Sequence, residues 1–186
     1  MQIRPIVSAD LDALAEIDAT VESTRYLHLD RGGSGLNVNW KVEERPLRSK
    51  LIESNALNDE QRFIVRQIAT GADEGIALVA EHEEQPVALL VAQPQPGHGT
   101  LKLIDLRVDY DHRREGLATA MLYQLIQTAR ETKLRAVAAE TRANNFPANQ
   151  LLAKLGFEIA GLDAQRNSNH DLVKEAVTLF WYAALD

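Results

Sequence analysis

The chain has 186 residues, 45% of them hydrophobic and 25% charged, a composition typical of a soluble protein with its own core. Its net charge of −7 argues against a nucleic-acid partner, which would need a basic surface, and is compatible with a cationic small substrate. The absence of cysteine excludes disulfides, thiolate metal sites and a cysteine nucleophile, and it fits a cytoplasmic location. No apolar run approaches membrane-spanning length, so we expect no membrane association.

The first third of the chain predicts a strand, a helix and a hairpin. Gln2 to Val7 alternates like a strand, and Ser8 can cap a helix whose apolar residues follow at helical spacing. The glycine cluster at positions 31–35 indicates a turn between two strands, Tyr26 to Leu29 and Leu36 to Val42. The same cluster could cradle phosphate, but it lacks the Lys-Ser/Thr ending of a P-loop.

The middle of the chain predicts one helix and a pair of antiparallel strands. Asn58 can cap a helix that runs to about Thr70, and three apolar side chains are expected to face inward: Phe63, Ile64 and Ile68. Ile76 to Ala80 and Val87 to Ala92 are apolar runs joined by a polar turn, which favours a hairpin. His82 lies in this turn beside glutamates at adjacent positions, without the spacing of metal ligands, and we expect no metal site.

The second half predicts a strand–helix–strand unit and further elements, which together indicate a mixed α/β sheet without a linker. The helix from Gly116 to Arg130 has a strong apolar stripe, and Gly156 is placed to end a later helix. The expected elements are a strand at 100–109, a helix at 116–130, a strand at 135–141, a helix at 148–155, and two closing strands at 157–163 and 175–183.

One segment between a strand and a helix has the features of an anion site. The strand ends near Asp109 and the helix begins near Gly116, and a helix N-terminus offers unpaired N–H donors with a partial positive charge. Gly116 permits close backbone approach, Ala118 keeps the next turn small, and Arg113 and Arg114 add positive charge. Because the Rossmann glycine spacing is absent, the segment predicts another kind of pyrophosphate site, with a plain structural loop as the alternative.

Two blocks of the sequence resemble the signatures of the GNAT N-acetyltransferases. Arg113, Gly116 and Ala118 occupy the three fixed places of the family pattern Arg/Gln-x-x-Gly-x-Gly/Ala. Downstream, the run from Asn145 to Phe157 is similar to the family pattern Asn-x-x-Ala…Tyr-x-Lys-x-Gly-Phe. Stretches at 140–141, 156–163 and 175–182 are also similar to streptothricin acetyltransferases, which acetylate an amine of a β-lysine side chain.

The resemblance implies a fold and a cofactor. The fold would be a GNAT-type central mixed, mostly antiparallel sheet of six to seven strands flanked by helices, as a single domain over residues 1–186. The co-substrate would be acetyl-CoA, with its pantetheine arm on strand backbone, its pyrophosphate on the N–H groups from Arg114 to Thr119, and Asn145 on its far side. The predicted cofactor-binding residues are Leu106, Arg107, Val108, Arg113, Arg114, Glu115, Gly116, Leu117, Ala118, Thr119 and Asn145.

The resemblance also implies direct attack of a neutral amine on the thioester in a ternary complex. Because an amine is protonated at neutral pH, a base or a water chain must remove a proton, and Asp105 and Glu140 are the acidic candidates. An ion pair of Asp105 with Arg107 or Lys102 is an equal alternative. Glu140 could equally hold a loop or bind a substrate ammonium.

The main departure from the family pattern is Leu152, which stands where the family often has a tyrosine that protonates the leaving thiolate. Another group, such as Tyr110, Tyr123 or Ser168, or water would have to serve, or transfer would be weak. The alternatives to a small-molecule acetyltransferase are a protein or peptide N-acetyltransferase and a non-catalytic acetyl-CoA-binding domain. The acceptor pocket is expected from the regions 26–50 and 164–174, and the sequence leaves a homodimer open.

Overall fold

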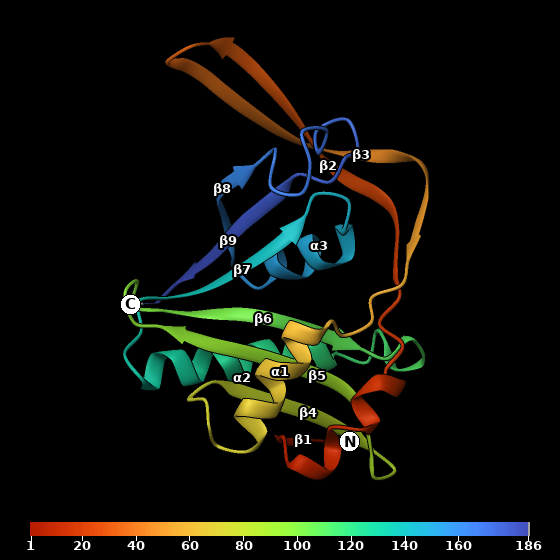
Figure 1. The fold of residues 1–186 in the computed structure, drawn as a ribbon. Coiled ribbons are helices and arrows are strands. Elements are labelled where there is room, and N and C mark those ends of the chain that lie inside the picture. Colours follow the sequence, from red (N-terminus) through yellow and green to blue (C-terminus); the bar gives the residue numbers. More distant parts are fainter. Residues whose placement is uncertain (186) are drawn as a thin grey trace. The chain divides into compact units, whose positions relative to one another are not determined.

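The structure is a computed structural model, and it describes residues 1–185 (Figure 1). Contacts divide the chain into two compact units. The first unit comprises Met1–Thr20, Ser54–Ala139 and the residues from Ala183 onward. The second unit comprises Val21–Glu53 and Glu140–Tyr182. The predicted single acetyltransferase domain stays a prediction.

The described residues form a mixed α/β fold, as predicted. Seven strands form one sheet in the order β1-β4-β5-β6-β7-β9-β8, and β2 and β3 form a separate antiparallel ribbon. The pairs β1–β4, β4–β5, β5–β6 and β8–β9 are antiparallel, whereas β6 and β7 run parallel and pair Thr100 with Ala136 and Lys102 with Ala138. The strands are β1 (Gln2–Pro5), β2 (Val21–Ser34), β3 (Asn37–Glu53), β4 (Ile76–His82), β5 (Gln85–Gln95), β6 (Thr100–Val108), β7 (Ala136–Arg142), β8 (Glu158–Asp163) and β9 (Thr178–Ala184). The helices are α1 (Asp59–Ala69), α2 (Leu117–Glu131) and α3 (Phe146–Lys154).

The core of the first unit follows from the alternation of side chains along β4 and β5. Val79, Leu89 and Val91 are buried on one face, where Ile64 and Ile68 of α1 pack against them. Helix α2 packs on β5 and β6 and buries the apolar stripe that the sequence predicts. Figure 1 shows α1 in front of these strands and α2 behind them. Helices therefore cover both faces of these strands. The end of β6 and the start of α2 lie in the same compact unit.

The ribbon of β2 and β3 dominates the second unit, and it is much longer than the two short strands predicted. A two-residue loop joins Ser34 to Asn37, and the strands pair from Val21 opposite Glu53 to this loop. Gly33 has φ +79, and a Cβ there would lie 1.8 Å from the carbonyl oxygen of Asn37, so the position needs glycine. Strand alternation gives the ribbon one apolar face and one polar face. The apolar face carries Leu29, Val38, Trp40 and Val42, and the polar face carries Tyr26, His28, Asp30, Lys41, Glu43 and Arg45.

Two predictions near the N-terminus and in α1 are wrong. The residues after Ser8 form two short 3₁₀ helices instead of one α-helix, because the Asp10 carboxylate accepts the Val7 N–H at 2.8 Å and pairs with Arg4 at 2.8 Å. In α1, Phe63 is 63% exposed rather than buried, and Val65 occupies the inward position. Asn58 does cap α1 as predicted.

Two element boundaries in the second unit also differ from the predicted ones. Helix α3 begins at Phe146, two residues before the predicted start, because the Asn145 side chain caps it and Pro147 suits the first helical turn. Strand β9 begins at Thr178 rather than Glu175, because Glu175 has φ +58, which is incompatible with a strand. The ends predicted for α2 agree with the structure within one residue.

Candidate functional site

The predicted anion site lies wholly in the first unit, between the end of β6 and the start of α2. Asp109 follows β6, and its carboxylate accepts the N–H groups of Asp18 at 2.9 Å and Asp111 at 3.1 Å. These bonds fold the chain into a 3₁₀ turn before the loop reaches Arg114 and Gly116, which have φ +66 and +84. Left-handed residues next to right-handed ones are typical of backbone turns that bind anions through their N–H groups.

The N-terminus of α2 differs from those of the other two helices. Asn58 caps α1 and Asn145 caps α3, whereas Gly116 at the start of α2 makes no side-chain cap bond. The first N–H groups of any α-helix lack intrahelical acceptors and carry a partial positive charge. In α2 these donors are therefore left for an exogenous acceptor, and Gly116 is exposed. The arrangement suits a phosphate group.

The two arginines of the loop are placed differently from each other. The Arg113 guanidinium donates to the carbonyl oxygens of Val108 at 3.3 Å and Asp18 at 3.4 Å and lies 5.0 Å from the centre of the Tyr110 ring. Arg113 thus braces the loop, while Arg114 is exposed. The predicted contacts of both side chains with a pyrophosphate stay predictions.

The predicted residues on β6 divide between backbone and side-chain roles. Leu106 and Val108 pair with Leu90 and Ala88 of β5, so one edge of this segment is fixed in the sheet. The Arg107 side chain is 1% exposed and donates to the carbonyl oxygen of Asn55 at 2.8 Å. Contacts of this segment with a pantetheine arm would therefore come from its backbone, because the Arg107 guanidinium is buried.

Asp105, one of the two predicted bases, is held in a buried ion pair. Arg107 donates to one carboxylate oxygen at 2.6 Å and to the other at 2.9 Å, and Gln61 adds a bond at 3.2 Å. Asp105 is 8% exposed, so its carboxylate could accept a proton only at the expense of this pair. The structure thus contains the ion pair that the sequence left as an alternative. A catalytic role for Asp105 stays a prediction.

The other predicted site residues lie in the second unit. Glu140 accepts a bond from Arg166 at 3.0 Å, and its side chain is 27% exposed. The Asn145 side chain accepts the Ala148 N–H at 3.4 Å, so its oxygen serves as the cap of α3. Leu152, at the usual tyrosine position, is buried. The structure therefore brings the predicted loop residues and Asp105 together in one unit, and Glu140 and Asn145 in the other.

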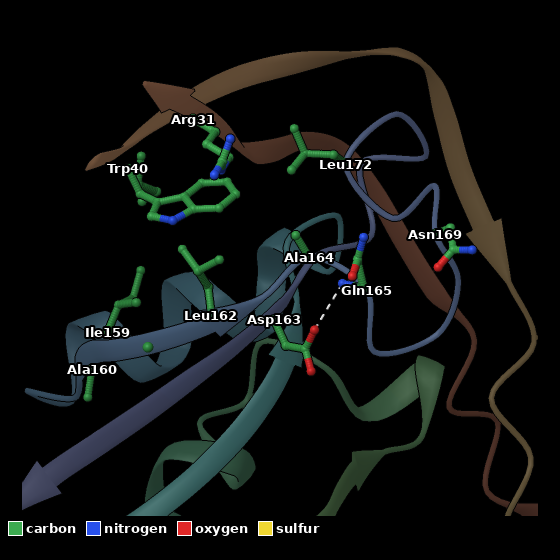
Figure 2. Close-up of a pocket in the computed structure, with 12 residues that line it drawn as sticks. Arg31, Trp40, Ile159, Ala160, Leu162, Asp163, Ala164, Gln165, Asn169 and Leu172 are labelled. Atoms are coloured by element: carbon green, nitrogen blue, oxygen red, sulfur yellow. Dashed lines mark hydrogen bonds between the residues drawn. The ribbon is translucent and has the colours of Figure 1, made fainter. Parts of the chain in front are cut away.

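An open pocket of about 950 Å³ lies in the second unit, on the apolar face of the ribbon. Figure 2 shows Trp40 and Arg31 of the ribbon facing Leu162 of β8 across it. The loop that follows β8 closes one side with Gln165 and Leu172. Both regions expected to supply an acceptor pocket contribute, but the β8 residues give no signal in the sequence, because their alternation is that of any half-buried strand.

Over residues 1–185, no group of three or more histidine and acidic side chains is placed to hold a metal ion. The prediction of a metal-free protein stays a prediction. Among the same residues, none of the helices has the length and apolar character needed to cross a bilayer.

A family model described as the acetyltransferase (GNAT) family matches residues 39–157, which include the loop, α2 and the downstream block. The chain belongs to this family. The match confirms the membership predicted from the two sequence signatures.

Individual GNAT relatives match over part of their length. The chain is 32% identical to streptothricin acetyltransferase A of Bacillus subtilis (strain 168) over 85 residues, 46% of this chain and 49% of that protein. It is 36% identical to N-acetyltransferase 8 of Homo sapiens over 87 residues, 45% of this chain and 38% of that protein. The matched segments thus span about half of these relatives or less.

Solved structures with the same fold match over the whole chain. A nourseothricin acetyltransferase has a TM-score of 0.77 at 19% identity, covering 100% of this chain and 98% of that one. A Bacillus anthracis protein described as a streptothricin acetyltransferase, solved in complex with acetyl coenzyme A, has a TM-score of 0.74 at 23% identity, covering 100% and 97%. At these identities the likeness shows the GNAT fold, and it agrees with the predicted fold class.

Proposed function

We propose that the chain is an N-acetyltransferase that moves the acetyl group of acetyl-CoA to an amine of a small molecule. The observation that carries the proposal is the start of α2, which has no side-chain cap and follows a loop with Arg114 and Gly116 in the left-handed region. A pyrophosphate would supply the acceptors that this helix lacks. Membership of the GNAT family supports acetyl-CoA as the ligand that brings it.

In the proposed reaction, a neutral amine attacks the thioester carbon within a ternary complex. A C–N bond forms, the C–S bond breaks, and coenzyme A leaves as a thiolate that takes up a proton. The enzyme would act mostly by positioning the reactants and polarising the carbonyl group. A thiolate is a tolerable leaving group, so the leucine at position 152 need not prevent the reaction.

Asp105 and Glu140 enter this reaction only as predicted bases. Each carboxylate is held by an arginine, through Arg107 and Arg166 respectively. The Glu140 side chain is more exposed, at 27% against 7% for that of Asp105, so Glu140 is the better placed of the two to meet a substrate. Turnover that survives Glu140→Gln unchanged would exclude it.

The names of the relatives support a small-molecule acceptor. Two of them are streptothricin acetyltransferases, and we propose that the acceptor of this chain is likewise a primary amine on a small molecule. The negative net charge suits such a cation. A cytoplasmic location is also proposed, in keeping with a cysteine-free sequence.

The test combines binding with turnover. Isothermal titration of the chain with acetyl-CoA should give a saturable signal, and an amine panel with thiol detection should show acceptor-dependent release of coenzyme A. The panel includes streptothricin and an alanine-terminated peptide. Absence of acetyl-CoA binding would overturn the proposal. Turnover of the peptide alone would assign the protein to peptide acetylation, and binding without any turnover would leave a non-catalytic binding domain.

A further inference from the structure

The polar face of the ribbon carries a chain of three hydrogen-bonded side chains on β2. The Tyr26 hydroxyl lies 2.8 Å from Nδ1 of His28, and Nε2 of His28 lies 2.8 Å from a carboxylate oxygen of Asp30. We propose that Tyr26, His28 and Asp30 form a proton path from a primary ammonium group, bound in the second unit, to solvent. The proposal rests on the proposed function and names the acceptor side of that reaction.

The exposure of the three side chains follows a path from the interior to water. Tyr26 is 7% exposed, the His28 side chain is 24% exposed and the Asp30 side chain is 56% exposed. Residues two apart on a strand share a face, so the backbone holds the three groups in line. A continuous set of hydrogen bonds that begins in the interior and ends in solvent is what a proton path requires.

The contacts determine which nitrogen of His28 carries its hydrogen. An ionised carboxylate only accepts, so the Asp30 contact requires a hydrogen on Nε2 of His28. In the neutral ring Nδ1 then carries a lone pair, so the Tyr26 hydroxyl has two acceptors, this nitrogen and the Glu175 carboxylate. Arg45 holds Asp30 at 3.4 Å and Glu43 at 2.7 Å. Asp30 thus orients the imidazole, and the imidazole is ready to receive the phenolic proton, the division of roles known from serine hydrolase triads.

The inner end of the path faces a carboxylate. Burial raises the pKa of the Tyr26 phenol, and the negative charge of Glu175 raises it further, against smaller opposing effects of Arg45 and Arg48. The phenol therefore keeps its proton and can pass it on. Glu175 has φ +58, a conformation that is costly for glutamate and that the surrounding structure must maintain. The Tyr26 hydroxyl is hydrogen-bonded to Glu175, and an ammonium group beside this pair would meet one acceptor and one opposite charge.

A second observation, on the segment that hydrogen-bonds to the Leu27 backbone, points to a ligand with N–H donors. The Leu27 N–H donates to Ala143 at 2.9 Å, and the Ala143 N–H donates to Val177 at 2.8 Å, so three segments meet here. Asn144 follows directly and is 7% exposed. Within residues 1–185, its Oδ1 is the buried side-chain N or O atom that has no hydrogen-bond partner. A buried oxygen without a hydrogen-bond partner is destabilising, and an ammonium donor would remove that cost.

One proton moves from the ammonium group to water along the path. The ammonium gives a proton to the Tyr26 oxygen while the Tyr26 hydroxyl gives its own proton to Nδ1 of His28. The imidazolium formed is stabilised by Asp30 and releases one proton to water. One proton thus leaves for each amine that becomes neutral, and the amine gains the lone pair that attacks the acetyl carbon.

Charged side chains of β3 lie opposite the path in the neutral pH range. Hydrogen bonds from Lys41 and then Arg45 lower the pKa of Glu43 to about 2, and the pKa values of Lys41 and Arg45 are raised by bonding to Glu43. These groups keep their charge throughout that range. The charged groups facing the path are Lys41, Glu43, Arg45 and Arg48 of β3 and Glu175 before β9.

The first arm of the test detects the site without turnover. Histidine rings labelled with ¹⁵N are followed by NMR while streptothricin is added to the protein without acetyl-CoA. The proposal expects the Nδ1 resonance of His28 to move on saturation, and to move already in Tyr26→Phe without ligand. A protein that acetylates streptothricin while the His28 resonances stay fixed overturns the path. A His28 response without any transfer supports the site and overturns the proposed function instead.

The second arm measures kcat/KM for streptothricin against pH. Tyr26→Phe and His28→Gln should each lower kcat/KM on the order of 10²-fold. Asp30→Asn should give a smaller loss. The matched control is exposed His98→Gln in the β5–β6 turn, which should match the wild type. Tyr26→Phe and His28→Gln variants that remain within twofold of wild type reject the path.

Discussion

The loop before α2 and the polar face of the ribbon are built on opposite principles. The loop is contiguous in sequence, and its donors are backbone N–H groups turned by Arg114 and Gly116. The ribbon face uses side chains, and it meets segments more than a hundred residues away, such as Glu175. A backbone site tolerates most side-chain changes but depends on conformation, whereas a side-chain path fails when one group is lost.

The largest effect that we expect comes from the buried ion pair that supports β6. Asp105→Ala leaves the Arg107 charge buried and unpaired, which should lower the free energy of unfolding by about 3–5 kcal/mol. Denaturant unfolding measures it, and exposed Asp111→Ala is the control. A stable Asp105→Ala protein with a large loss of kcat would instead identify Asp105 as a base and place side-chain chemistry in the first region too.

The next effect tests whether the loop acts through its backbone. Gly116→Asp should weaken acetyl-CoA binding by about 100-fold or more, or about 2.7 kcal/mol, because a negative charge would occupy the phosphate site. A Cβ at Gly116 would meet no atom within 4 Å, so crowding does not explain the loss. Gly116→Asn, neutral and tolerant of the same φ, should bind within a few-fold of wild type by titration calorimetry. Equal losses in both variants would mean that conformation, not charge, is what Gly116 supplies.

The structural features behind these predictions differ in how clearly the sequence indicates them. The loop and the bounds of α2 were predictable because a glycine, an apolar stripe and a short motif lie within one contiguous stretch. The Asp105–Arg107 pair was visible as two opposite charges two residues apart on a strand. The ribbon was predicted too short, because charged residues and glycines carry little strand signal even where pairing extends the strands.

Long-range partners explain what could not be predicted in the candidate sites. No local pattern indicates that Tyr26 faces Glu175, because their contact depends on how the β8–β9 loop returns to the ribbon. The 3₁₀ turns after Ser8 arose from Arg4 binding Asp10, and the exposure of Phe63 reflects which face of α1 meets β4. In each case tertiary contacts overrode a local preference.

A smaller effect is expected from the side-chain cap of α1, which α2 lacks. Asn58→Ala should destabilise the chain by about 1 kcal/mol, since it removes the capping box of α1. Saturating acetyl-CoA should stabilise the same variant as much as it stabilises wild type, because its donors are those of α2. Thermal unfolding with and without ligand measures both. An unequal ligand effect would mean that the two helix ends are coupled.

The smallest expected effect is a difference between Asp10 and Asp171 in how salt changes their contribution to stability at acid pH. Hydrogen bonds from Arg4 lower the pKa of Asp10, and the N–H of Asn167 with the hydroxyl of Ser168 lowers that of Asp171. Because both folded pKa values are depressed, each group contributes stability above about pH 4 that is lost as pH falls further. Salt should weaken the Asp10 contribution more, because an ion pair is screened. Denaturant unfolding of Asp10→Asn and Asp171→Asn at two salt concentrations checks this; equal salt responses would contradict it.

The length of the ribbon has a consequence for how the family could diversify. Its register is set by the two-residue loop after Ser34 and by alternation with period two. Removing two residues from each strand, in matched positions, would keep every remaining side chain on its own face. The ribbon can therefore lengthen or shorten by such steps in evolution or design. Each step would change how far Trp40 and Arg31 extend over β8.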